Sequence, residues 1–136
     1  NFSAGSYGSW KTDLASQGEI GGVGYVIDAS RFHTDGYRDH SSVTRDQTYA
    51  KLNFAPDADS RITVLANGFS QPLAQDPLGL NWNAYKSNPR GVDPVALQYD
   101  TRKRIEQMQG GVSYERRFGP DTLSLAVYAG QRAVTQ

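Results

Sequence analysis

Apolar and polar residues alternate with a period of two along most of the chain, which is the pattern of β-strands with one apolar face. In one stretch Val23, Tyr25 and Ile27 alternate with Gly24 and Asp28. Long segments with a helical period are absent, so the chain is expected to be all-β. The pattern predicts six strands, at residues 1–17, 23–34, 44–55, 61–71, 102–118 and from 123 to the end.

The predicted strands are joined by connections that alternate between short and long. Tight turns are expected at three places rich in Gly, Pro, Asp and Ser, namely Gly18–Gly22, Pro56–Ser60 and Gly119–Asp121. A polar loop is expected at Asp35–Ser42, and Pro72–Thr101 is a long connection without clear periodicity. Loops of that length are uncommon in compact domains and often carry function. In an antiparallel sheet the short connections would therefore gather at one end and the long ones at the other.

Strand length and loop sorting favour a membrane barrel over a soluble sheet. The predicted strands run to roughly 11–17 residues, against a usual 5 or 6, whereas a tilted membrane-spanning strand takes about 9–11 within the bilayer. Short periplasmic turns and longer outer loops are typical of outer-membrane barrels. The expected fold is an antiparallel up-and-down transmembrane β-barrel segment. A soluble β-sandwich with one wet face explains the alternation equally well, but not the strand length or the loop sorting.

Alternation also predicts which side chains share a face. The apolar face is expected to meet lipid and holds Trp10, Leu14, Tyr25, Ile27, Ala29, Leu52, Phe54, Ile62, Val64, Val112, Tyr114, Leu123, Leu125 and Val127. The polar face is expected to point inward and holds Lys11, Asp13, Asp28, Ser30, Lys51, Asn53, Thr63, Asn67, Gln107, Gln109, Ser113 and Glu115. Tyr25, Phe54 and Tyr114 lie near the short turns, where an aromatic girdle would sit at the membrane interface.

Composition narrows the possible functions. The chain has 14 basic and 14 acidic residues, and this balance argues against a nucleic-acid binder. It has no cysteine, which excludes disulfides and thiolate metal sites. It begins at Asn1 without a signal-peptide pattern, so the chain is expected to be processed or an excerpt of a longer protein. No apolar run approaches the length of a transmembrane helix.

The sequence does not lead us to expect a catalytic or metal site in this chain. His33 and His40, with Asp35 and Asp39 nearby, match no strong metal-ligand spacing. No phosphate-binding loop and no Ser-His-Asp arrangement stands out, so the sequence predicts neither an enzyme nor a metal site or cofactor. An outer-membrane protease is a distant alternative.

Four stretches of the chain carry a resemblance to a known family. The most specific is Tyr25–Ser41, whose core is Phe32-His33-Thr34-Asp35-Gly36-Tyr37-Arg38-Asp39, and the others are Gly5–Thr12, Arg45–Leu52 and Gln71–Leu80. They resemble TonB-dependent outer-membrane receptors of the siderophore-receptor type. The core resembles that family's strand and loop of aromatic, Arg or His, Thr, Asp, Gly, aromatic, Arg and acid. Gly5–Thr12 looks like an early barrel strand of the family, and Arg45–Leu52 and Gln71–Leu80 resemble a later strand and the opening of a long loop.

The resemblance implies a role in active import across the bacterial outer membrane. Residues 1–136 would form part of a 22-strand barrel, with the plug domain and TonB box of complete receptors absent from this chain. The expected function is binding and TonB-energised import of a ferric siderophore or a similar scarce, bulky nutrient. The expected partners are that ligand, outer-membrane lipid, the plug of the same protein and TonB. A passive porin is the nearer alternative, and a soluble β-sandwich binding module the more distant one.

Ligand contacts are expected in the outer loops and at the rim, where Arg and aromatic side chains suit anionic, aromatic siderophore complexes. The candidates are Arg38, His40, Arg45, Gln71, Trp82, Tyr85, Arg90, Tyr99, Arg102 and Arg104. The alternative is that these are ordinary solvated loop residues. The sequence identifies neither the substrate nor the oligomeric state.

Overall fold

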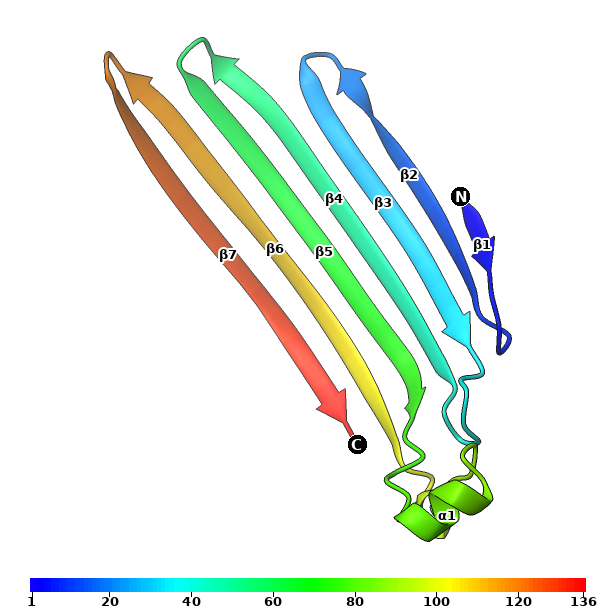
Figure 1. Cartoon of the computed structure of the whole chain (residues 1–136). Coiled ribbons are helices and arrows are strands. Elements are labelled where there is room, and N and C mark those ends of the chain that lie inside the picture. Colours follow the sequence, from blue (N-terminus) through cyan, green and yellow to red (C-terminus); the bar gives the residue numbers. More distant parts are fainter.

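Seven antiparallel strands form one sheet, and each strand pairs with its neighbours in the chain (Figure 1). The computed structural model describes all residues, 1–136. The strands are β1 Phe2–Ala4, β2 Trp10–Ile20, β3 Val23–Thr34, β4 Val43–Asp57, β5 Ser60–Gln75, β6 Arg102–Phe118 and β7 Asp121–Thr135. Two short helices, α1 Trp82–Ser87 and α2 Pro94–Tyr99, lie between β5 and β6. The expectation of an all-β, antiparallel, up-and-down sheet is confirmed.

The first predicted strand is wrong in one respect, because residues 1–17 form two strands. The backbone reverses at Tyr7 and Gly8, whose φ values are 60° and 64°, and Ala4 then pairs with Trp10. Gly tolerates this left-handed conformation without strain. A run of Gly and Ser fits a weak strand and a turn equally well, which is why alternation alone missed the reversal.

The three short connections are tighter than predicted, with two residues each. Ile20 pairs with Val23, Asp57 with Ser60 and Phe118 with Asp121. Gly21 and Gly22 both have positive φ, as a two-residue hairpin turn of type I′ requires. The flanking residues of each predicted turn belong to the strands. In the Asp57 turn, the backbone N–H of Asp59 donates to the Asp57 carboxylate at 2.9 Å and, with the Ser60 hydroxyl, lowers the pKa of Asp57.

The long connection is more ordered than the sequence suggested. Its first four residues extend β5 to Gln75, with a register shift between Gln71 and Ala74 that accommodates Pro72. The two helices each begin at a capping side chain. The Asn81 carboxamide accepts from the N–H of Ala84. The Asp93 carboxylate accepts from the N–H of Val95, and Pro94 occupies the first helical turn.

The short connections lie at one end of the sheet and the long connections at the other. The three two-residue turns lie together, and residues 5–9, 35–42 and 76–101 lie at the opposite end (Figure 1). The predicted sorting of short and long connections is therefore confirmed. Neither helix has the length and apolar character needed to cross a membrane.

Cross-strand register divides the side chains into two faces as predicted. Residues directly opposite each other in neighbouring strands point to the same side. The partners of Ile20 run across the whole sheet and are Val23, Phe54, Ile62, Tyr114 and Leu125. Every member of the predicted apolar set lies on this face, and every member of the predicted polar set lies on the other.

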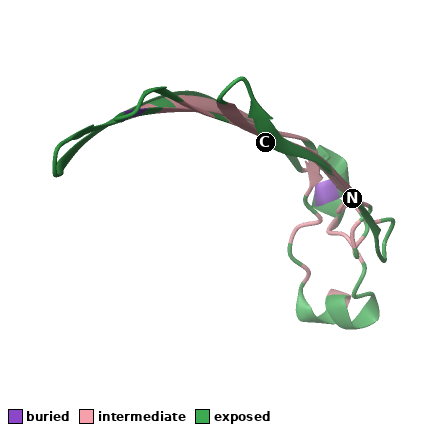
Figure 2. Ribbon diagram, turned by 90° about the horizontal axis from the view of Figure 1, so that it is seen from above, coloured by how far each residue is buried: buried purple, intermediate pink, exposed green.

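The sheet is a single curved layer (Figure 2). Only Ala96 and Ser60 are buried, so the chain has no hydrophobic core of its own. Backbone ladders hold the layer together, with 72 of the 87 backbone hydrogen bonds lying within helices and strands. The sheet does not close into a barrel, and β7 is unpaired along its outer edge. A one-layer sheet with an exposed apolar face is incomplete by the usual rules of domain architecture.

Candidate functional site

Three segments far apart in the chain form one structure at the long-connection end. We call this structure the loop cap and define it as residues 5–9, 35–42 and 76–101. Arg38 is its main link. The Arg38 guanidinium donates from Nε to the Gly91 carbonyl at 2.9 Å, from Nη1 to that of Leu78 at 2.7 Å and from Nη2 to that of Pro77 at 3.3 Å. The planar fork of donors in Arg suits such a set of acceptors.

Arg90 makes the second link of the loop cap. Its Nε donates to the Tyr37 carbonyl at 3.0 Å, and the Asp39 N–H donates to the Arg90 carbonyl at 2.8 Å. The Arg90 guanidinium also lies 5.9 Å from the Tyr7 ring centroid and 5.8 Å from that of Tyr37. These two rings meet edge to face at 5.5 Å. Cation–π contacts of this kind therefore join all three segments.

His40 makes the third link. Its side chain is only 8% exposed, and Nε2 donates to the Thr101 carbonyl at 2.9 Å. The Asp100 carboxylate lies 3.8 Å from the same nitrogen. His33 has separate partners, since Nδ1 lies 3.0 Å from the Thr44 hydroxyl. The two histidines therefore serve different local contacts.

Four further sequence candidates lie on strands or at their ends. Arg45 is on the same face as Lys11 and Asp13, with its guanidinium 5.5 Å from the Phe32 ring centroid and its buried Nε without a hydrogen-bond partner. Gln71 shares that face.

Arg102 and Arg104 pair with carboxylates close by in the chain. Arg102 contacts Asp100 at 2.9 Å, and Arg104 contacts Glu106 at 3.4 Å. Arg104 shares the face of Val112, so it points away from Arg45 and Gln71.

The remaining candidates are aromatic residues of the two helices. Trp82 is 66%, Tyr85 49% and Tyr99 70% exposed. Trp82 and Tyr85 stack with ring centroids 5.7 Å apart and an interplanar angle of 21°. The Lys86 ammonium lies 5.6 Å from the Trp82 ring centroid. Lys86 was not among the residues that the sequence singled out.

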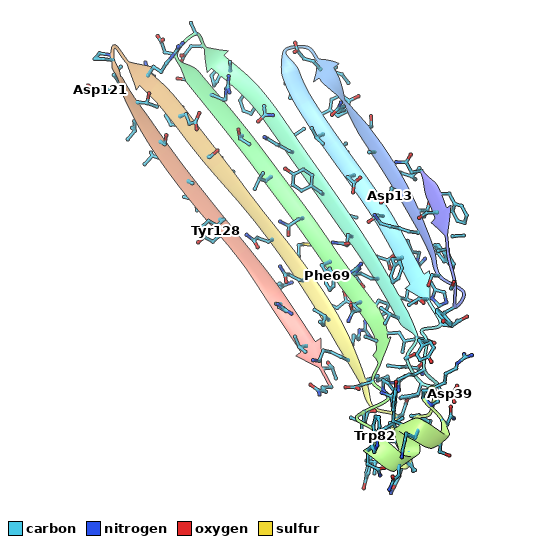
Figure 3. The ribbon with its side chains drawn as sticks, in the orientation of Figure 1. Asp13, Asp39, Phe69, Trp82, Asp121 and Tyr128 are labelled. Carbon is cyan, nitrogen blue, oxygen red and sulfur yellow. The ribbon has the colours of Figure 1, made fainter.

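The polar face of the sheet carries a second candidate region. A hollow of about 600 Å³ spans six strands on this side, which is therefore the concave side of the curved sheet. Its lining is mainly polar and comprises Lys11, Asp13, Asp28, Ser30, Gln47, Thr48, Tyr49, Asn67, Gly68, Phe69, Ile105, Gln107 and Arg132. Figure 3 labels two of these residues, Asp13 on β2 at one side of the region and Phe69 on β5 nearer its middle.

Sequence reasoning identified part of this hollow and missed the rest. Lys11, Asp13 and Asn67 were among the predicted inward residues, whereas Tyr49, Phe69 and others were not. Cross-strand pairing identifies these residues, because Phe69 lies directly opposite both Gln47 on β4 and Gln107 on β6. The formal charges of the lining cancel, because it holds two basic residues, Lys11 and Arg132, and two acidic ones, Asp13 and Asp28. Lys11 and Asp13 form an ion pair at 2.6 Å.

The structure thus separates the ten ligand candidates into groups. Arg38, His40 and Arg90 hold the loop cap together, and Arg102 and Arg104 form ion pairs. Arg45 and Gln71 face the concave side, while Trp82, Tyr85 and Tyr99 are exposed to solvent.

The chain matches no model of a known protein family.

Proposed function

We propose that this chain is part of the barrel wall of a TonB-dependent outer-membrane receptor, which binds and imports a ferric siderophore or a similar scarce, bulky nutrient. The observation that carries the proposal is a band of apolar side chains on the convex face, bounded on the loop-cap side by a row that includes Arg31, Asp46 and Glu106 and on the turn side by Arg116. The polar concave face of the sheet would line the interior of the barrel, and the loop cap would face the outside of the cell.

The height of the apolar band supports a position in a bilayer. On the convex side of β6, Arg116 and Glu106 lie at its two borders, with Tyr114, Val112 and Met108 between them. The ten residue steps from one border to the other, at about 3.3 Å each, give roughly 33 Å along the strand, and a tilt of about 40° reduces this border-to-border distance to roughly 25 Å. The apolar band of outer-membrane barrels has a height of about 25 Å.

Side chains at the borders of the band support the same position. At the loop-cap border, Arg31 pairs with Asp46 at 3.1 Å, and Ser70 donates to Glu106 at 3.1 Å. These charged and polar groups would meet water or lipid headgroups. At the other border Phe54 and Tyr114 share one row next to the two-residue turns, as an interfacial aromatic girdle requires.

The open edges of the sheet support a larger barrel. An edge strand of 15 residues such as β7 exposes, along its unpaired side, backbone donors and acceptors that other strands can pair with. In a bilayer every such group must be satisfied, and closure of the sheet achieves this. The resemblance to TonB-dependent receptors implies that the other strands, the plug and the TonB box belong to the same protein.

The proposal is tested with the gene and with growth. We expect the parent gene to encode a plug domain and a TonB box before the barrel, and a deletion strain to lose growth on at least one iron source of a panel of siderophores. A tonB deletion should give the same loss. A gene without a plug and TonB box, or normal growth on every iron source, would overturn the receptor assignment and favour a passive porin.

A further inference from the structure

Helix α1 displays an aromatic pair that its own fold does not use. No residue of the helix is buried, and Trp82 lies on the part of the loop cap farthest from the short turns (Figure 3). The ends of the helix are held by Asn81, which accepts from the N–H of Ala84, and by the Asn88 N–H, which donates to the Ala84 carbonyl. Trp82 and Tyr85 are thus free to serve a ligand. Exposed aromatic groups of this kind mark interaction sites.

The helix is held in place from both sides. Leu78 precedes it and Gly91 follows it, and both carbonyls accept from the same guanidinium, that of Arg38. Arg90, just after the helix, is fixed between two tyrosine rings. A ligand that binds the aromatic pair would therefore meet a preorganised surface, which lowers the entropic cost of binding.

The segment that carries the helix has charged residues of one sign only. Residues 77–92 contain no Asp or Glu and include Lys86 and Arg90. The acidic residues that flank this segment accept from local backbone donors, Asp76 from the N–H of Leu78 and Asp93 from that of Val95. The Lys86 ammonium makes no ion pair with a carboxylate and lies near the Trp82 ring. The surface therefore suits an anion.

We propose that Trp82, Tyr85 and Lys86, together called the aromatic patch, select an anionic ligand that carries flat rings. The inference rests on the proposed import of iron complexes, and it assigns the ligand to the catecholate class. An iron(III) catecholate complex is an anion with aromatic rings on its outside, so its rings stack on the tryptophan and tyrosine while its charge meets Lys86. An iron(III) tris-hydroxamate centre, which is uncharged and has no aromatic ring, gains neither contact.

The test compares these two probes on the intact purified receptor in detergent. Binding of an iron(III) catecholate complex and of an iron(III) hydroxamate complex is titrated for the wild type and three variants. Trp82→Ala/Tyr85→Ala should weaken catecholate binding about tenfold, as two lost aromatic contacts imply. Lys86→Gln should weaken it about threefold and reduce its salt dependence. Asn83→Ala, an exposed change in the same helix, is the matched control and should leave binding unchanged.

The outcomes separate this inference from the proposed function. Unchanged catecholate binding in the double variant overturns the proposed role of the aromatic patch. A wild type that prefers the hydroxamate complex also overturns it. Neither result contradicts the proposed import of iron complexes. Equal weakening of both probes in the double variant also overturns the role of the patch, since it indicates a general disturbance of the loop cap. A wild type that binds neither complex overturns this inference alone, and normal growth of the deletion strain on every iron source removes the iron-import proposal and this inference with it.

Discussion

Arg38 shows how one residue can join parts of the chain that the sequence keeps far apart. Its acceptors, Leu78 and Gly91, lie 40 and 53 residues away. The sequence singled out Arg38 as a ligand-contact candidate, on its type and its place in a loop. Its three backbone acceptors could not be foreseen, because the contact depends on how a long connection folds back over a distant loop.

Replacing Arg38 with Lys should loosen the loop cap without unfolding the sheet. Lys keeps the charge but lacks the planar fork, so most of the three hydrogen bonds are lost. Charged hydrogen bonds of this kind are worth about 2 kcal/mol, which corresponds to roughly 30-fold faster local opening. Hydrogen–deuterium exchange of the intact protein should show faster exchange at residues 76–101 and no change in the middle of β6.

Arg104→Lys is the control for that measurement. Arg104 is also a sequence candidate, but it contacts only Glu106, and both side chains are largely exposed. Exposed ion pairs contribute little. Equal exchange rates in Arg38→Lys and wild type would show that the guanidinium does not hold the loop cap.

At the scale of the element, strands were far easier to predict than helices. Alternation placed β6 at its observed bounds, Arg102–Phe118, because seventeen residues repeat the period many times. Helices α1 and α2 have six residues each, under two turns, so no helical period can emerge. The available signals were capping residues, since Asn81 and Asp93 with Pro94 mark helix starts.

Neighbouring residues of β6 offer a direct test of the two faces. The chain has no cysteine, so single thiols can be introduced cleanly. In native outer membranes Val112→Cys, on the convex face, should react at least about tenfold more slowly with a water-soluble maleimide than Ser113→Cys, on the concave face, because thiolate formation is suppressed in lipid. Labelling is measured by mass shift.

Thr122→Cys, beside the turn at Gly119, should react readily in the same membranes and serves as the control. Both strand variants should label fully after denaturation, which shows that each thiol is intact. If Val112→Cys and Ser113→Cys react equally fast in the membrane, the convex face does not lie against lipid.

At the scale of the whole molecule, the chain is a single-layer sheet without a hydrophobic core. Large apolar side chains on the convex face, such as Leu14 and Val127, are 71% and 75% exposed. Expressed alone, the 136-residue chain should therefore aggregate in buffer or require detergent, as seen by size-exclusion chromatography with and without detergent. A monomer that unfolds cooperatively in plain buffer would contradict the barrel proposal and favour the soluble sandwich.

The sequence could predict this incompleteness but not the curvature. Long alternating strands with too few apolar residues for two faces already imply a single layer. The hollow formed around Tyr49 and Phe69 depends on how neighbouring strands twist and on register, which two-residue periodicity does not encode. For the same reason, the concave residues were assigned to a face but not to a common region.

The pairing of every strand with its neighbour in the chain has a consequence for assembly. No strand has to wait for a distant segment before it can join the sheet, so the sheet can grow hairpin by hairpin in the order of synthesis. The three two-residue turns close the hairpins β2–β3, β4–β5 and β6–β7 with little loss of chain entropy. At every stage one strand edge stays open to receive the next, and in this chain that edge is β7.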